Sequence, residues 1–412
     1  MKTPELLLPA GSLEKMRYAF AYGADAVYAG QPRYSLRARN NEFGLEELAT
    51  GIAEAHALGR KFYVTSNLMA HNAKVKSYLA DIEPVIAMGP DALIMADPGL
   101  ISMVRERWPA VPVHLSVQAN TVNYASVNFW KALGLTRVIL SRELSLDEIA
   151  EIRSRCPDME LEVFVHGALC IAYSGRCLLS GYFNHRDANQ GTCTNSCRWD
   201  YKVLENKEYV IEEGQRPGEL MPIEEDEHGT YILNSKDLRA VEHVERLTQI
   251  GVDSLKIEGR TKSVYYVART AQVYRRAIDD AASGKPFDPA HLKSLEHLAQ
   301  RGYTGGFYQR HSPSETQNYA TGQSETGVSQ YVGDITSYDA ASGMAEVLVK
   351  NRIRVGDRLE IITPAGNAEV VLERMENRDG DPLDVAPGNG WIVRIPLPSG
   401  VSSQHAMLTK LL

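Results

Sequence analysis

The sequence predicts an α/β protein, built as a (β/α)8 TIM-type barrel with a cysteine-rich insertion and followed by a small all-β barrel. Eight short apolar runs alternate with amphipathic helical segments between residues 5 and 260, and the interval before the eighth run is much longer than the others. From residue 327 onward, short alternating strands and turn glycines replace that pattern. Strands that alternate with helices form parallel βαβ units, whereas a series of short strands forms a sandwich or a barrel.

The eight predicted strands share one local pattern. In four of them a glycine ends the preceding helix and an apolar run follows closely, as in Gly23-Ala-Asp-Ala-Val-Tyr-Ala-Gly30. Glycine adopts the left-handed conformation that stops a helix, and an apolar run without polar alternation is typical of a strand buried on both faces. The predicted strands are 5–9, 23–30, 61–65, 89–97, 113–117, 134–141, 160–165 and 251–258.

Amphipathic segments between these runs supply the predicted helices, such as 13–22, 45–58 and 75–88. Ser145 and Glu148 form a capping-box pattern directly before another helical segment. Eight such units over about 280 residues suit a closed barrel better than an open doubly wound sheet. The turn after the first strand, Pro9-Ala-Gly-Ser12, also lacks the Gly-x-Gly-x-x-Gly pattern of dinucleotide-binding folds.

Three domains are predicted along the chain. A catalytic barrel covers 1–284 and includes the insertion at 168–250, a helical and turn-rich connector covers 285–326, and the β-barrel covers 327–412. Helices are expected at 263–282 and near 291–300, and strands at 344–350, 358–362 and 391–395, with a tight turn at Val355-Gly-Asp357. A long insertion at the carboxyl end of a barrel usually serves function.

The net charge of −8 is concentrated in the insertion. Residues 205–228 contain nine acidic and two basic side chains, so the rest of the 412-residue chain is nearly neutral. The overall charge therefore does not exclude a polyanionic partner such as RNA, because local clusters form the electrostatic footprint. No apolar run reaches the ~18 residues of a membrane span, and the N-terminal residues do not resemble a signal peptide. We expect a cytoplasmic protein without membrane contact.

Cysteines supply the sharpest chemical signal. Four of the five lie in one stretch of the insertion: Cys170, Cys177, Cys193 and Cys197. Four thiolates satisfy either a tetrahedral Zn²⁺ or a 4Fe–4S cluster, and the spacing leaves both open, with four reduced core cysteines as the remaining alternative. Cys156 precedes Pro157 at a helix end and is interpreted as structural.

The cysteine segment resembles the signature of the U32 peptidase family. The residues that carry this resemblance are Glu162-x-Phe164-x-x-Gly167-Ala-Leu-Cys170 and Gly175-x-Cys177-x-Leu179-Ser180. Longer stretches at 24–37, 114–120, 189–195 and 227–237 resemble the bacterial branch of that family that makes 5-hydroxyuridine at the tRNA wobble position. The resemblance implies a 4Fe–4S cluster on the four cysteines, prephenate as a small carboxylate co-substrate, tRNA as the partner and an oxygen-independent hydroxylation. Whether a protein partner takes part stays open.

Polar residues at the ends of the predicted strands are expected to point into the barrel mouth, where barrel enzymes carry their chemistry. The candidate catalytic residues are Asn67, Gln118, His166 and Glu258. The candidate substrate-binding residues are Arg33, Arg37, Arg39, Arg142 and Arg260, because a guanidinium fork fits carboxylates and phosphates. Gly30, Asp97 and Asn120 hold similar strand-end positions, and any of these groups could instead satisfy loop backbone.

Two alternative functions stay open from the sequence. A U32-type peptidase would use Cys170 with His166 as its base, but the chain has neither a Gly-x-Ser-x-Gly nor a His-Glu-x-x-His motif. A zinc-stabilised, non-catalytic RNA-binding module is the second alternative. In the C-terminal barrel, either an RNA-binding edge or a solvated strand face is formed by Lys350, Arg352, Arg354 and Arg358.

Overall fold

The computed structural model describes residues 2–36, 42–169, 209–212, 220–223, 225–226, 229–230, 237–298, 302–309, 329–398 and 401–411. Between 209 and 230 the description is limited to the backbone. The four clustered cysteines, Arg37, Arg39 and the acidic side chains of 205–228 lie outside the described residues.

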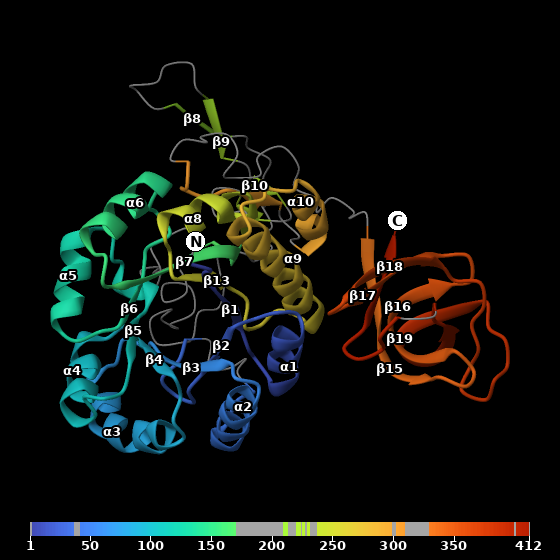
Figure 1. The fold of residues 1–412 in the computed structure, drawn as a ribbon, viewed down its shortest axis with the longest axis horizontal. Coiled ribbons are helices and arrows are strands. Elements are labelled where there is room, and N and C mark those ends of the chain that lie inside the picture. The colour runs from blue at the N-terminus through green and yellow to red at the C-terminus, as the bar shows by residue number, and fades with distance from the viewer. Residues whose placement is uncertain are drawn as a thin grey trace.

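Eight parallel strands form a closed barrel (Figure 1). Each strand pairs with the next one along the chain, and the last pairs with both the first and the seventh, which closes the ring. All eight predicted strands are confirmed. They are β1 (Glu5–Pro9), β2 (Ala26–Gly30), β3 (Lys61–Ser66), β4 (Ala92–Met95), β5 (Val113–Leu115), β6 (Arg137–Ile139), β7 (Glu160–Ala168) and β13 (Ser254–Ile257).

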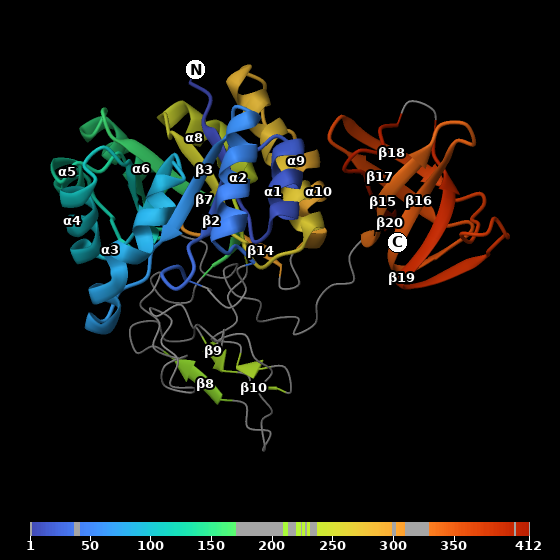
Figure 2. The ribbon, with the colours of Figure 1, turned by 90° about the horizontal axis from the view of Figure 1, so that it is seen from below.

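Helices surround the barrel on its outer side (Figures 1 and 2). The predicted capping box is confirmed, because Ser145 Oγ accepts from the Glu148 N–H at 3.3 Å and Glu148 Oε2 accepts from the Ser145 N–H at 2.9 Å. The helix predicted to begin at residue 75 begins at Asn72. The prediction missed its first turn because those residues do not continue the apolar pattern. The helices are α1 (Leu13–Ala21), α2 (Leu45–Ala57), α3 (Asn72–Ala87), α4 (Pro98–Arg107), α5 (Tyr124–Ala132), α6 (Leu146–Arg155), α8 (Val244–Ile250) and α9 (Val264–Ala282).

Additional strands lie at the mouth end of the barrel. β12 (Asp237–Arg239) pairs antiparallel with the last residues of β7 and parallel with β14 (Tyr303–Thr304). Two short hairpins precede it, one formed by β8 (Tyr209–Glu212) and β9 (Leu220–Ile223), the other by β10 (Glu225–Asp226) and β11 (Gly229–Thr230). In Figure 2 the first hairpin lies beyond the barrel end opposite the N-terminus. The connector contains α10 (Ala290–Leu295).

The C-terminal region is a six-stranded antiparallel sheet with its own apolar core. Its strands run in the order β18-β17-β20-β15-β16-β19. The segment after β18 returns to the far edge, where Glu376 and Arg394 of β19 exchange backbone hydrogen bonds at 2.9 and 2.8 Å, so the sheet curls into a small barrel. The strands are β15 (Ser329–Asp339), β16 (Met344–Arg354), β17 (Arg358–Thr363), β18 (Gly366–Val371), β19 (Val385–Pro396) and β20 (Met407–Leu411).

The C-terminal sheet packs against α1 and α9 of the barrel (Figure 1). Arg269 of α9 contacts both carboxylate oxygens of Glu360 in β17, at 3.1 and 2.9 Å. Tyr22, which follows α1, places its hydroxyl 3.0 Å from the Ile362 carbonyl. These buried polar contacts fix the second domain to the outside of the barrel, away from the mouth. Among the described residues, none of the helices has the length and apolar character that a bilayer crossing requires.

Candidate functional site

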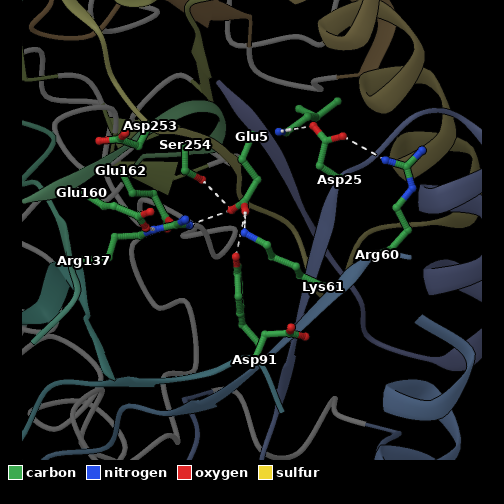
Figure 3. A network of polar contacts seen from close by, with 12 residues as sticks. Glu5, Asp25, Arg60, Lys61, Asp91, Arg137, Glu160, Glu162, Asp253 and Ser254 are labelled. Atoms are coloured by element: carbon green, nitrogen blue, oxygen red, sulfur yellow. Dashed lines mark hydrogen bonds and ion pairs between the residues drawn. The ribbon is translucent and has the colours of Figure 1, made fainter. Parts of the chain in front are cut away.

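An ion network lies inside the barrel, toward the amino-terminal ends of the strands (Figure 3). Arg137 of β6 lies 2.6 Å from Glu5 and 3.0 Å from Glu162, and its Nε lies 2.9 Å from Glu160. Lys256 of β13 donates to the other oxygen of Glu162 at 2.8 Å. Burial alone would lower the pKa of Arg137, but Glu162 and Glu5 outweigh it and raise the pKa above its ordinary value. Because these groups pair with one another, they have a structural role. In the sequence they are recognisable as charged residues within otherwise apolar strands.

Aromatic rings separate this network from the mouth. Lys256 Nζ lies 4.4 Å from the centre of the Tyr28 ring and 5.4 Å from that of Phe164. The Arg142 guanidinium lies 4.0 Å from the same Phe164 ring and donates to the Ala168 carbonyl at 2.8 Å. Arg142, a predicted substrate-binding residue, is therefore held at the floor of the mouth by cation–π contact and a backbone acceptor.

A chain of hydrogen bonds links the segments that follow β2, β3 and β5 at the mouth and joins two of the predicted catalytic residues. The Leu36 N–H donates to Asn67 Oδ1 at 3.2 Å, and Asn67 Nδ2 makes a longer contact of 3.5 Å to Ser116 Oγ. Ser116 Oγ in turn donates to Gln118 Oε1 at 3.2 Å. Gln118 lies in η2 (Val117–Ala119), a short 3-10 turn after β5. We call the side chains of Asn67, Ser116 and Gln118 the mouth relay.

Arg260 anchors the start of the mouth relay. Arg260 is 8% exposed, and its guanidinium donates to the Leu36 carbonyl and to Thr65 Oγ1, the latter at 3.2 Å. Both backbone polar groups of Leu36 are thus bound, the carbonyl by Arg260 and the N–H by Asn67. Sequence reasoning did not identify Leu36, Thr65 or Ser116, because a backbone group and two small hydroxyls carry no distinctive pattern.

His166 lies apart from the mouth relay. Its ring packs against Tyr266 and Tyr274 of α9 and against Tyr303 of β14, with centroid distances of 5.3 to 5.7 Å. Its Nδ1 lies 3.3 Å from the Tyr274 hydroxyl, while Nε2 has no hydrogen-bond partner among the described residues. Burial lowers the pKa of His166 to about 3, so the ring is neutral at pH 7. Its catalytic role stays a prediction.

A β-bulge explains this orientation of His166. Phe164 pairs with Lys256, but the next pair is His166 with Ile257, so Val165 is an extra residue on β7. A bulge reverses the alternation of side chains along a strand. His166 therefore points outward toward α9. Glu258, at the end of β13, is half-buried, and its carbonyl accepts from the Tyr266 hydroxyl at 2.8 Å.

Arg33 lies on the rim of the mouth beside a second cation. Its Nη1 contacts Asp81 at 2.9 Å, its carbonyl accepts from Lys74 Nζ at 3.1 Å, and its side chain is 61% exposed. The buried Tyr34 ring lies between the two cations, at 5.7 Å from Arg33 and 6.0 Å from Lys74. Burial and the nearby Arg33 charge lower the pKa of Lys74. The rim thus places Arg33, which pairs with Asp81, next to a second cation, Lys74.

Other sequence candidates have structural explanations. Asp97 caps α4 by accepting from the Gly99 and Leu100 N–H groups at 2.8 and 3.1 Å, so this strand-end carboxylate satisfies backbone donors. In the C-terminal barrel, Lys350, Arg354 and Arg358 each pair with a carboxylate, at 3.7, 3.3 and 3.1 Å. Among the described residues, no three His, Cys, Asp or Glu side chains are grouped to hold a metal ion.

Comparison with known proteins gives matches over nearly the whole chain. A profile of peptidase family U32 matches residues 11–318, and a profile of the peptidase family U32 C-terminal domain matches residues 328–408. The chain is 60% identical over 441 aligned positions to tRNA hydroxylation protein P of Escherichia coli, with 100% of this chain and 97% of that protein covered. It is 57% identical over 441 positions to tRNA hydroxylation protein P of Haemophilus influenzae, with 99% and 96% covered. It is also 32% identical over 336 positions to a 23S rRNA 5-hydroxycytidine synthase of Escherichia coli, with 82% of this chain and 47% of that protein covered.

Proposed function

This chain belongs to peptidase family U32, and from that membership we propose that it is a tRNA-modifying enzyme that hydroxylates C5 of the wobble uridine to 5-hydroxyuridine. Relatives at 60% and 57% identity carry the name tRNA hydroxylation protein P. The structural observation that carries the proposal is the mouth relay of Asn67, Ser116 and Gln118. Amide and hydroxyl groups held in place by the protein are the groups that read the polar edge of a base.

A barrel mouth suits this chemistry because the reacting base must be unstacked from the adjacent bases to be modified. Enzymes that modify bases act on single-stranded or extruded nucleotides that enter a pocket. A wobble nucleotide lies in the anticodon loop, so its base is extruded at little cost. Arg33 and Lys74 on the rim would then contact phosphates of the loop, since cations beside a pocket position a nucleic-acid backbone.

The proposed cofactor is a 4Fe–4S cluster on Cys170, Cys177, Cys193 and Cys197. Four thiolates form a complete ligand set for such a cluster, and Zn²⁺ is the alternative ion for the same set. The chain reaches the first of them directly from β7, whose last residue, Ala168, accepts from Arg142 at the mouth. When bound, a cluster would supply one-electron transfer. The proposed co-substrate is prephenate, whose carboxylates fit Arg142 and Arg260.

Anaerobic purification tests the cofactor. We expect a brown protein with iron and acid-labile sulfide, whose colour is lost in Cys170→Ser and kept in the matched control Cys156→Ser. Cys156 is the suitable control because its Sγ hydrogen-bonds to the Tyr124 carbonyl and to Asn128 at 3.5 and 3.4 Å, outside the cysteine cluster. A colourless protein with stoichiometric zinc would refute the cluster.

Mass spectrometry of tRNA nucleosides tests the reaction. In a strain without this gene and without a redundant enzyme, 5-hydroxyuridine and its derivatives should be absent and should return with the wild-type chain but not with Cys170→Ser. Their persistence in the deletion strain would reject the proposal. Release of peptides from a denatured protein substrate by the purified chain would favour the peptidase alternative. RNA binding without any modified nucleoside would favour the zinc-stabilised binding module.

A further inference from the structure

We propose that Gln118 recognises the C4 carbonyl oxygen of uracil and thereby selects uracil over cytosine; this inference rests on the proposed function. Gln118 is the last member of the mouth relay, and the residue is 3% exposed. Its Nε2 has no hydrogen-bond partner among the described residues. The relay therefore ends in a buried donor for which the described residues supply no acceptor.

The direction of the relay follows from its first member. A backbone N–H can only donate, so the Leu36 N–H requires Asn67 to present Oδ1 to it and Nδ2 to Ser116. Ser116 accepts from that amide and uses its single proton to donate to Gln118 Oε1. Gln118 is thereby held with its oxygen toward Ser116, which leaves its NH₂ group available to a ligand. Hydrogen bonds that run in one direction polarise each other, which strengthens the terminal donor.

The backbone around both ends of the relay is fixed as well. At the first end, Arg260 donates to the Leu36 carbonyl. At the other end, Asn120 Nδ2 donates to the Gln118 carbonyl at 2.8 Å, and Asn120 itself has a left-handed φ of 52°. Non-glycine residues rarely adopt that conformation, and where they do the surrounding contacts maintain it. Gln118 is thus presented by a rigid turn, as a specificity-determining group requires.

An unpaired buried amide is costly, and a ligand that supplies an acceptor removes that cost. Uracil presents a carbonyl oxygen at C4, next to the reacting C5, whereas cytosine presents an amino group at the same position. The Gln118 NH₂ group can donate to the uracil carbonyl, whereas it would face another donor, the amino group, in cytosine. Discrimination against a base that leaves a buried polar group unpaired is typically large.

The test compares two substrates on one holoenzyme. Anticodon stem–loop RNAs with uridine or cytidine at the wobble position are incubated anaerobically with the reconstituted full chain and prephenate, and kcat/KM is measured for each. Gln118→Glu replaces the donor by an acceptor of the same shape. We expect it to lower kcat/KM for the uridine RNA roughly 10- to 100-fold and to shift the uridine-to-cytidine ratio toward cytidine. Gln272→Glu, a buried glutamine at the contact with the C-terminal sheet, is the control and should leave the ratio unchanged.

A second variant tests the relay itself. Ser116→Ala removes the donor that orients Gln118, so the amide can turn its oxygen toward the ligand. We expect discrimination between the two RNAs to fall while the unfolding midpoint changes little, an effect that a merely structural role of Ser116 would not produce. Equal losses on both RNAs would overturn the proposal, because they would place Gln118 at the C2 carbonyl shared by both bases.

A third outcome concerns the co-substrate. If the Gln118 variants raise KM for prephenate and leave the base ratio unchanged, the donor serves a carboxylate oxygen and the proposal is overturned. If the wild-type holoenzyme hydroxylates neither RNA, the proposed function fails instead. The two failures are therefore distinguishable.

Discussion

Removal of Arg137 from the barrel interior should strongly destabilise the barrel. The side chain is 3% exposed and is the shared cation of Glu5, Glu160 and Glu162, at 2.6 to 3.0 Å (Figure 3). Arg137→Met keeps the length and the apolar stem but leaves the fully buried Glu162 with Lys256 alone and Glu5 without its closest cation. Loss of one partner from a buried ion pair costs about 3–5 kcal/mol, because the remaining charge stays desolvated. For a domain of this size that corresponds to a fall in Tm on the order of 10 °C.

The penalty of Arg137→Met should depend on pH. Burial alone would raise the pKa of Glu5, but Arg137 outweighs it and holds the pKa below its ordinary value of 4.5. In the wild type this carboxylate adds stability above pH 4.5, and that stability is lost as the pH falls through the lowered pKa. In the variant Arg137 no longer offsets the effect of burial, so the pKa of Glu5 rises above 4.5. The buried carboxylate then lowers the free energy of unfolding at any pH at which it is charged. The difference between the two proteins is therefore largest at pH 7 and shrinks as the pH falls toward 4.5.

Urea unfolding followed by far-UV circular dichroism measures this effect, because the described α-helices all precede the C-terminal sheet. Arg107→Met is the matched control: Arg107 and Glu83 form a pair at 4.0 Å whose side chains are 64% and 60% exposed. Loss of such an exposed pair costs less than about 1 kcal/mol. A penalty for Arg137→Met as small as that of the control, or one that stays constant between pH 7 and about 4.5, would refute the reasoning.

Three further predictions concern the rim, a helix cap and the contact between the domains. Arg33→Ala should weaken tRNA binding uniformly and reduce the slope of log affinity against log salt by about 1, measured by filter binding; an unchanged slope would contradict a phosphate contact. Ser145→Ala should lower barrel stability by about 1 kcal/mol in urea unfolding, because α6 loses its capping hydroxyl, and a cost near zero would argue against the cap. Arg269→Ala removes the cation paired with Glu360 and should separate the unfolding of the C-terminal sheet from that of the barrel in calorimetry, whereas a single unshifted transition would show that this pair does not couple them.

The barrel strands could be predicted because their signal is local. Each strand is a short and mostly apolar run that is buried on both faces, and glycine stops the helix before several of them, as Gly251 does after α8 with φ 85°. Helix caps such as Ser145 are local as well, since a side chain bonds to a backbone group three residues away. The hairpin-rich end of the chain was predicted for the same reason, through alternating strands and the turn at 355–357.

The mouth was predicted only in part. Asn67, Gln118 and Arg260 were identified as strand-end residues, and the structure joins them through Leu36, Thr65 and Ser116. Those three could not be found from the sequence because their role depends on a backbone peptide and two hydroxyls brought together from different strands. His166 was expected in the mouth because it lies at a strand end, but the extra residue on β7 turns it toward α9.

The sequence by itself determined the (β/α)8 class, the position of the cysteine-rich insertion and the family resemblance, because strand burial, helix stops and spaced cysteines are properties of neighbouring residues. The tertiary structure alone decided which polar groups meet. Arg137 of β6 contacts Glu5 of β1 within the closed ring of strands, and Asn67 after β3 contacts Ser116 after β5. Closure of a barrel brings together residues far apart in the chain, and a single bulge changes the face on which a side chain lies. Side-chain direction, and with it the chemistry of the mouth, is therefore a property of the assembled barrel.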